Sequence, residues 1–593
     1  MSTVRRIIFV AFLFNALFLS AQSFMTNVPF RKQTSLNGKW HVIIDPSDWG
    51  ISCGTPFYKD MKPTGKTDFY EYSFDGDLQF DVPGDFNSQM TELKNYESTV
   101  WYKKDFDVVK KSGKRLFLYF DAVNYQTDVF LNAQKIGSHE GGFTPFQFEV
   151  TDKIKSGQNS VILRVNNQRQ KNGVPALDYD WLNYGGITRD VRLVETSESY
   201  IDDYFIQLDK KNRDRISGYV KLAGATNPQK VKIQIPEIKI NQVVLTNADG
   251  YAALSFPVKL NLWSPSNPKL YKVIISSASD TVSEEIGFRT IETKGEDILL
   301  NGKPIYLKGI NFHEEIPQRK GRAYSEADAL MLLTWAKELG CNFIRTAHYA
   351  QNEYIVRMAE KMGFMLWEEI PVFQTINFEN SKTCELMNMQ LKETIRRDKN
   401  RCAIVIWSMA NETVPSYSRT KAISEMAKLC RSIDSTRLVS AVFNNFKIEG
   451  NKVMMEDSLI NWLDVIAVNE YIGWYVKWPA APNQVEWVSK YNKPLIMTEF
   501  GGEAVYGNHG LDDVVSSWSE EYLEKLYRDQ ITMLENIPFL RGCCPWILAD
   551  FQSPRRMHPV YQNGWNRKGL ISEKGYKKKA WYVMKDFYTK YHH

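Results

Sequence analysis

Residues 305–348 read IYLKGINFHEEIPQRKGRAYSEADALMLLTWAKELGCNFIRTAH, and this stretch sets the architecture of the second half of the chain. Its two apolar runs, IYLKGINFH and NFIRTAH, are typical of buried strands. The segment between them is typical of a helix, because Ser325 can cap it, acidic residues occupy its first turn and Gly340 can end it. The order strand, helix, strand predicts a parallel β-α-β unit.

The same alternation continues to the end of the chain. Helical segments separate eight apolar runs, which are IYLKGINFH, NFIRTAH, FMLWEE, AIVIWSMANE, RLVSAV, DVIAVNEY, PLIMTEF and CCPWILADF. Eight β/α units in about 300 residues predict a (β/α)8 TIM barrel, which we assign to residues 293–593. An open doubly wound sheet is the alternative, but the chain has no glycine-rich dinucleotide loop or Walker loop to support it.

The first half of the chain reads as β-structure. Short apolar or alternating runs, such as RLFLYFDAV and SVILRVNNQ, are separated by turns rich in Gly, Asn and Ser. We predict a β-sandwich of the jelly-roll type at 22–195 and an immunoglobulin-like β-sandwich at 196–292. A chain of 593 residues is long enough for these three domains.

The N-terminus has the pattern of a secretory signal peptide at 1–21. Two arginines precede the apolar run IIFVAFLFNALFLSA, which ends at Ala21, a small residue suited to cleavage. We therefore expect an exported protein, periplasmic or secreted, without a membrane anchor after cleavage. Cleavage removes two arginines and no acids, so the formal net charge falls from +5 to +3. That charge is too small to indicate a nucleic-acid partner.

Cysteine and histidine usage gives no sign of a metal site. The seven cysteines are few and odd in number, which argues against a disulfide framework, and the eight histidines are scattered. No CxxC pair or HxxxH spacing occurs, so we expect neither a metal nor an organic cofactor. We also expect the protein to form a homo-oligomer.

Polar residues end seven of the eight apolar runs. In a TIM barrel the active site lies at the C-terminal ends of the strands, so these residues predict a hydrophilic pocket there. Carboxylates and aromatic residues without a metal or phosphate motif indicate glycoside hydrolysis, which needs one carboxylic acid and one carboxylate. The spacing leaves the choice open among Glu368, Glu369, Glu412, Glu470 and Glu499.

The chain resembles glycoside hydrolase family 2 over nearly its whole length after the signal peptide. The resemblance lies in GGFTPFQFEV and DYDWLNYGGITRDV of the first domain, GFRTIE at the junction, and KGINFHE, FIRTAHY, SMANE and MTEFG of the barrel. It implies that Glu412 is the general acid/base and Glu499 the nucleophile of a retaining reaction. The carboxyl groups of retaining enzymes lie about 5–5.5 Å apart.

Within this family the sequence resembles β-glucuronidases, which carry an N-x-K motif after the eighth strand. Here the motif is Asn566-Arg567-Lys568. The resemblance implies that Asn566 and Lys568 bind the carboxylate of a uronic acid, and a partly desolvated carboxylate does require a cation and a hydrogen-bond donor. We expect Lys568 to lack a counter-ion when a neutral sugar is bound.

The resemblance implies roles at the sugar for seven further residues, which are Asp180, His313, Asn411, Asn469, Tyr471, Tyr475 and Trp546. Asp180 would come from a jelly-roll loop, and Asn411 would bind the sugar 2-hydroxyl. Arg345 and His348 would support the carboxylates. The role of Arg555 and Arg556 stays open between a second anionic unit and none.

These expectations together predict a carbohydrate-active enzyme, namely an exo-acting, retaining β-glucuronidase that releases terminal glucuronic acid from glycan fragments. A β-galacturonidase or β-galactosidase of the same family is the first alternative. A non-catalytic carbohydrate-binding protein is the alternative from another class, although both implied catalytic glutamates are present.

Overall fold

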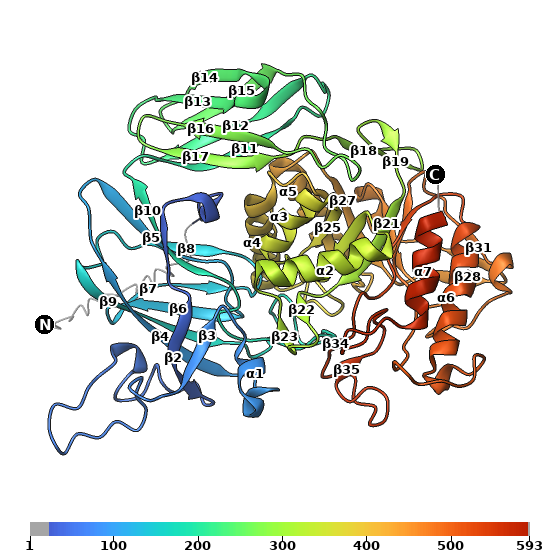
Figure 1. The fold of residues 1–593 in the computed structure, drawn as a ribbon, viewed down its shortest axis with the longest axis horizontal. Coiled ribbons are helices and arrows are strands. Elements are labelled where there is room, and N and C mark those ends of the chain that lie inside the picture. The colour runs from blue at the N-terminus through green and yellow to red at the C-terminus, as the bar shows by residue number, and fades with distance from the viewer. Residues whose placement is uncertain (1–22, 591–593) are drawn as a thin grey trace, which may run out of the picture.

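The structure, a computed structural model, describes residues 23–590. Figure 1 shows the first domain in blue beside the barrel in yellow to red, with the second domain in green above them. The predicted fold class is confirmed: two β-sandwiches precede a closed eight-stranded barrel. The signal peptide predicted at 1–21 lies outside the described residues. Within 23–590, no helix combines the length and the apolar character that a bilayer crossing requires.

The first domain is a sandwich of two antiparallel sheets, with strand orders β3-β2-β4-β9-β6-β7 and β1-β10-β5-β8. Large apolar side chains such as Trp40, Tyr102 and Phe120 are fully buried between the sheets. The strands are β1 (Gln33–Ser35), β2 (Gly38–Asp45), β3 (Gln79–Val82), β4 (Thr99–Val108), β5 (Lys114–Phe120), β6 (Gln126–Leu131), β7 (Gln134–Glu140), β8 (Phe146–Glu149), β9 (Gly157–Asn166) and β10 (Val191–Ser197).

The second domain is a smaller sandwich of the sheets β11-β12-β15 and β14-β13-β16-β17. Buried and exposed residues alternate strictly along Tyr251–Pro257, as expected for a strand with one face on the core and one in water. The strands are β11 (Tyr200–Leu208), β12 (Arg215–Ala223), β13 (Lys230–Ile235), β14 (Ile240–Leu245), β15 (Tyr251–Pro257), β16 (Tyr271–Ser276) and β17 (Thr281–Ile286).

The barrel strands run parallel and close in the order of the chain. Every residue of Ile404–Asn411 and of Leu438–Phe443 is buried, which explains why these strands appear in the sequence as continuous apolar runs. The strands are β21 (Leu307–Phe312), β24 (Phe343–Thr346), β25 (Met365–Glu369), β26 (Ile404–Asn411), β27 (Leu438–Phe443), β30 (Ile466–Asn469), β32 (Leu495–Glu499) and β33 (Leu540–Cys543).

Helices follow six of the barrel strands: α2 (Glu326–Leu339), α3 (Glu353–Met362), α4 (Ser381–Asp398), α5 (Tyr417–Ile433), α6 (Glu520–Glu535) and α7 (Lys579–Lys590). The predicted ends of α2 are confirmed. The Ser325 hydroxyl accepts a hydrogen bond from the Asp328 amide, and Gly340 ends the helix with a φ of 95°.

The two connections around β30 differ from the expected helical units. The first contains the hairpin of β28 (Lys447–Glu449) and β29 (Lys452–Met454), then the 3-10 helix η5 (Ser458–Trp462). The second contains the 3-10 helix η6 (Pro482–Gln484) and β31 (Glu486–Val488), which pairs with β29. Gly450 turns the hairpin at a φ of 62°, and Pro479 and Pro482 disfavour a helix in the second connection.

The N-terminal end of the barrel is closed. A small sheet of β18 (Ile291–Lys294), β19 (Asp297–Leu300) and β20 (Lys303–Pro304) lies between the second domain and the first barrel strand. Its buried side chains Ile298 and Leu300 belong to one apolar cluster with barrel residues such as Phe343. A site that admits a ligand therefore has to open at the other end, where the strands end in polar residues.

Candidate active site

Glu499 ends β32 and is held by two neighbours. Its Oε2 accepts a hydrogen bond from the Tyr471 hydroxyl at 2.7 Å, and its Oε1 accepts one from Arg345 Nη1 at 2.8 Å. Burial raises the pKa of Glu499; the charge of Arg345 opposes this shift, and the charge of Glu412 adds to it. Two hydrogen bonds thus fix the carboxyl group in position, and the charge of Glu412 acts on its pKa.

Arg345, on β24, is fully buried and connects several strand ends. Besides Glu499, its guanidinium donates to Asn411 Oδ1 at 2.8 Å and to Glu369 Oε1 at 2.9 Å. His348 Nδ1 lies 2.7 Å from the same Glu369 oxygen. Burial raises the pKa of Glu369, but Arg345 and His348 outweigh it and bring the pKa down to about 2. Arg345 and His348 therefore contact the buried carboxylates as the resemblance implied.

Glu412 lies immediately after β26, with its backbone in the left-handed region at a φ of 53°. Its Oε1 accepts from Asn469 Nδ2 at 2.9 Å, and its Oε2 accepts from Gln374 Nε2 at 2.8 Å. A residue other than glycine pays for this backbone conformation in strain, and such positions are concentrated at functional sites. Two amide groups thus hold the carboxyl group of Glu412 in position.

Asn411 has one unused polar atom. Its Oδ1 accepts hydrogen bonds from Arg345 and from Asn469. Its Nδ2 is buried and has no hydrogen-bond partner among the described residues. A buried donor without a partner is costly, so this amide is suited to a ligand oxygen, such as the sugar hydroxyl that the resemblance implied.

A single cavity of about 270 Å³ brings most of the predicted residues together. Its lining includes Glu412, Glu499, Lys568, Asp180, Asn411, Asn469, Tyr471, Tyr475 and Trp546. Asn566 is fully buried next to the cavity, where its Nδ2 lies 3.3 Å from Asp180 Oδ2. Both implied catalytic glutamates therefore open into the same space as the lysine of the N-x-K motif.

His313, like Asn566, is a predicted residue outside the cavity lining. Its ring packs against Phe551 at 4.4 Å and against Trp546 at 5.4 Å between centroids, and its Nδ1 is 3.3 Å from the Tyr349 hydroxyl. Burial lowers its pKa well below the ordinary value. A neutral, buried histidine behind Trp546 is placed to support the subsite rather than to touch a sugar.

Lys568 lies in a cluster of charges. Its ammonium donates to the Tyr475 hydroxyl at 2.8 Å and forms an ion pair with Glu503 at 3.2 Å. Arg556 donates to the same hydroxyl at 3.0 Å and pairs with Asp180. Although burial raises the pKa of Tyr475, these two cations lower it. The cluster presents two cations and two carboxylates beside the cavity.

The expectation that Lys568 lacks a counter-ion with a neutral sugar is wrong, because Glu503 supplies one. Glu503 is buried and also accepts from Gln562 Nε2 at 3.0 Å and from the Arg567 amide at 3.0 Å. Only two of the three ammonium protons have a side-chain partner among the described residues. The charge of Lys568 is therefore already paired, and one of its ammonium donors stays available to a ligand.

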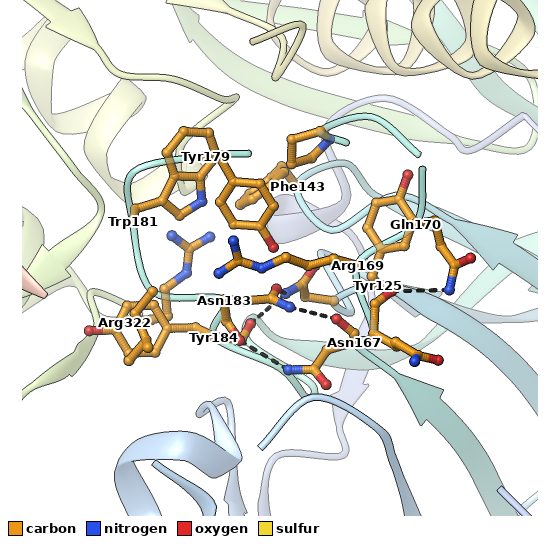
Figure 2. Close-up of a pocket in the computed structure, with 14 residues that line it drawn as sticks. Tyr125, Phe143, Asn167, Arg169, Gln170, Tyr179, Trp181, Asn183, Tyr184 and Arg322 are labelled. Atoms are coloured by element: carbon orange, nitrogen blue, oxygen red, sulfur yellow. Dashed lines mark hydrogen bonds between the residues drawn. The ribbon is translucent and has the colours of Figure 1, made fainter. Parts of the chain in front are cut away.

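The loop that carries Asp180 extends from the jelly roll and is anchored at both ends. Figure 2 shows its base, where Asn167 Nδ2 donates to the Asn183 carbonyl at 3.0 Å. Asn124 Nδ2 also donates to Asn183 Oδ1 at 3.1 Å. Next to Asp180, Trp181 packs among barrel aromatics, 5.2 Å from Phe373. The jelly roll thus contributes a wall of the cavity.

Two of the residues missed from the sequence hold charged groups of the site. Gln374, which holds Glu412, lies in a loop without a recognisable motif. Glu503 follows MTEFG by only a few positions, and a carboxylate so close to a strand end was a usable signal. Its partner Lys568 is far away in the sequence, however, so the pairing itself could not be read.

A TIM barrel whose mouth holds two carboxyl groups, amide donors and aromatic walls in one pocket is the architecture of a glycoside hydrolase. Comparison with known families agrees from residue 34 almost without a gap. The glycosyl hydrolases family 2 sugar binding domain matches residues 34–197, the central family 2 domain matches 199–289, and the family 2 TIM barrel domain matches 291–592. The chain belongs to glycoside hydrolase family 2.

Relatives of known name point in one direction. A β-glucuronidase from Streptococcus agalactiae serotype V is 28% identical over 563 residues, covering 85% of this chain and 90% of its own. A β-glucuronidase from Paenibacillus borealis is 26% identical over 610 residues, covering 93% and 96%.

Solved structures agree in fold. A β-glucuronidase from an uncultured Clostridium species superposes with a TM-score of 0.81 at 27% identity, over 96% of this chain and 100% of its own. A family 2 β-galacturonidase from Eisenbergiella tayi gives a TM-score of 0.79 at 23% identity, over 97% and 99%. At that identity the second likeness shows the shared fold alone.

Proposed function

We propose that this protein is a retaining, exo-acting β-glucuronidase that releases terminal β-linked glucuronic acid from glycan fragments. The observation that carries the proposal is the shared cavity. Glu412, Glu499 and Lys568 line one cavity, so a sugar whose anomeric carbon meets the glutamates can direct a carboxylate towards the lysine. The names of the relatives support the same sugar.

The reaction would proceed in two displacements. Glu499 attacks the anomeric carbon while Glu412 gives a proton to the departing glycosidic oxygen, which leaves a covalent glycosyl-enzyme. Glu412 then takes a proton from a water molecule, whose oxygen attacks the same carbon and releases Glu499. Tyr471 and Arg345 hold the Glu499 carboxylate in line, and Asn411 Nδ2 donates to the sugar 2-hydroxyl.

Recognition of the sugar carboxylate would combine two donors. The free ammonium proton of Lys568 and the neighbouring Asn566 amide reach the carboxylate, and Asp180 accepts from the ring hydroxyls. A bond between an ammonium and a carboxylate is about twice as strong as one between neutral groups. This difference would favour a uronic acid over a sugar with a hydroxymethyl group, even though Glu503 already pairs with the lysine.

A panel of p-nitrophenyl β-glycosides tests the proposal. We expect the glucuronide to give the highest kcat/KM, ahead of the galacturonide, galactoside and mannoside, and Glu499→Gln to abolish turnover. The first product detected by NMR should be the β-anomer. Preference for a neutral sugar would reject the proposal. Preference for the galacturonide would favour the first alternative, and binding without turnover that is unaffected by Glu499→Gln would favour a carbohydrate-binding protein.

Export and assembly are part of the proposal. We propose cleavage after Ala21, release into the periplasm and association into a homo-oligomer. N-terminal sequencing of the mature protein, cell fractionation and light scattering would test the three points separately.

A further inference from the structure

A second depression adjoins the catalytic cavity. It is an open groove of about 600 Å³ between the jelly-roll segment 171–178 and the barrel segments 374–379 and 414–418. Gln374 lines both the groove and the catalytic cavity, so the two spaces adjoin at this residue. We call this space the Gln374 groove.

The groove begins at the implied acid/base. Gln374 donates its amide to Glu412 Oε2 at 2.8 Å. The general acid of a glycosidase must face the glycosidic oxygen that leaves. Lys568 and Asp180, by contrast, line the catalytic cavity and not the groove. The groove therefore lies on the side of the leaving group, while the uronic acid itself occupies the catalytic cavity.

The lining of the groove suits a carbohydrate chain. Hydroxyl and amide side chains, among them Thr375, Asn377 and Ser416, can exchange hydrogen bonds with sugar hydroxyls. Leu177 and Val414 expose 45% and 65% of their surfaces and offer apolar contacts for the faces of sugar rings. The volume falls in the range of about 300–1,000 Å³ that is typical of ligand sites.

The charges of the lining select among carbohydrates. The lining contains one cation, Lys171, and two carboxylates, Asp178 and Glu379, so it carries an excess of negative charge. A second uronate or a sulfate ester placed there would be repelled, because like charges close together disfavour binding. Neutral sugar units meet no such penalty.

Hydrogen bonds fix the two walls of the groove relative to each other. Its jelly-roll wall and its barrel wall are joined, since Asn377 Nδ2 donates to Asn172 Oδ1 at 3.0 Å and the Thr383 hydroxyl donates to the Asn172 carbonyl at 3.0 Å. A preformed site loses little conformational entropy on binding.

We propose that the Gln374 groove binds neutral sugar units on the leaving-group side of the cleaved bond, so that the natural substrate is an oligosaccharide with a terminal uronic acid on a neutral chain. The inference rests on the proposed function, because it takes the uronic acid to be held in the catalytic cavity.

The test fills the groove by a substitution at a residue that takes no part in the proposed proton transfer or nucleophilic attack. In Val414→Trp a large side chain fills the groove, and in the matched control Val243→Trp the same change is made at a residue of β14 that is 57% exposed. Each variant is assayed with p-nitrophenyl β-glucuronide and with a neutral tetrasaccharide that carries a terminal β-glucuronic acid. We expect Val414→Trp to lower kcat/KM for the tetrasaccharide about tenfold or more, equivalent to about 1.4 kcal/mol of lost binding. Val414→Trp should lower kcat/KM for the p-nitrophenyl substrate by a clearly smaller factor, because that leaving group spans less of the groove than a trisaccharide does. Both values of the control should stay within about twofold of the wild type.

The outcomes separate the two proposals. If the wild type fails to hydrolyse the p-nitrophenyl glucuronide, the proposed function is rejected. If it hydrolyses both substrates and Val414→Trp changes them equally or not at all, the groove inference alone is rejected. A tetrasaccharide of alternating uronic acids should be cleaved more slowly than the neutral chain, and Glu379→Gln should reduce that difference. Faster cleavage of the acidic chain by the wild type would overturn the selection for neutral units.

Discussion

Replacement of Lys568 by alanine tests sugar recognition most directly, because the structure separates two effects of the change. The first effect acts on any substrate: Glu503 loses its partner at 3.2 Å and stays buried with Arg556 and two hydrogen-bond donors. The second acts only on an acidic sugar, which loses an ammonium donor in a largely desolvated site. Truncation of one partner of a buried charged hydrogen bond costs about 2–5 kcal/mol. We take about 2–4 kcal/mol for the glucuronide, which corresponds to a loss of about 30- to 900-fold in kcat/KM.

The assay compares p-nitrophenyl β-glucuronide with the matching β-glucoside, which differs only at C6. Lys568→Ala should lower kcat/KM for the glucuronide by the full factor and change the glucoside by less than about fivefold, a difference below about 1 kcal/mol. Thermal unfolding measured in parallel gives the shared loss of stability. Equal losses for the two sugars would refute the assignment of Lys568 to the carboxylate, because they would mean that the lysine only stabilises the fold around Glu503.

Three further predictions follow from charges at the site. Burial raises the pKa of Glu499, and only the ionised form of this residue attacks the sugar. As the pH decreases, kcat/KM for an activated aryl glucuronide should therefore begin to fall above pH 4.5. Glu412→Gln should move this fall to lower pH, because it removes one charge that raises the pKa of Glu499. Burial raises the pKa of Glu470 to about 8, so the folded state holds a proton that the unfolded chain loses above pH 4.5, and stability decreases as the pH rises between these values. Glu470→Gln should therefore raise Tm more at pH 8 than at pH 5. An equal change at both pH values would contradict the raised pKa. Arg555 lines the cavity and forms no ion pair among the described residues. Arg555→Gln should lower kcat/KM for the glucuronide about three- to tenfold at low salt and have little effect at high salt, where exposed charges are screened. An effect independent of salt would exclude an electrostatic role for Arg555.

The barrel could be predicted from the sequence because its strands are buried on both faces. Runs such as AIVIWSMANE contain no exposed position, and the helix at 326–339 carries both of its end signals. The connections around β30 could not be predicted as easily. A short hairpin and a 3-10 helix are too short to produce a recognisable hydrophobic period. The prediction of helices in these two connections therefore depends on the regular alternation of the neighbouring units.

The members of the site could be listed, but the contacts among them could not. The strand-end rule placed Glu412, Glu499 and Asn469 at one rim, and the cavity contains all three. The ion pair of Lys568 with Glu503 joins residues from different loops, and no local pattern encodes such a pairing. The same limit applies to His313, because the sequence does not show whether a histidine packs behind the aromatic side chains or lines the cavity.

The reach of the Asp180 loop into the barrel makes catalysis a property of two domains at once. If heating or dilute denaturant separates the jelly roll from the barrel, the pocket loses one wall while all eight barrel strands stay paired. Turnover should therefore be lost before secondary structure is lost. For the same reason, a shortened protein that contains only residues 293–593 should lack glycoside hydrolase activity even if its barrel is folded.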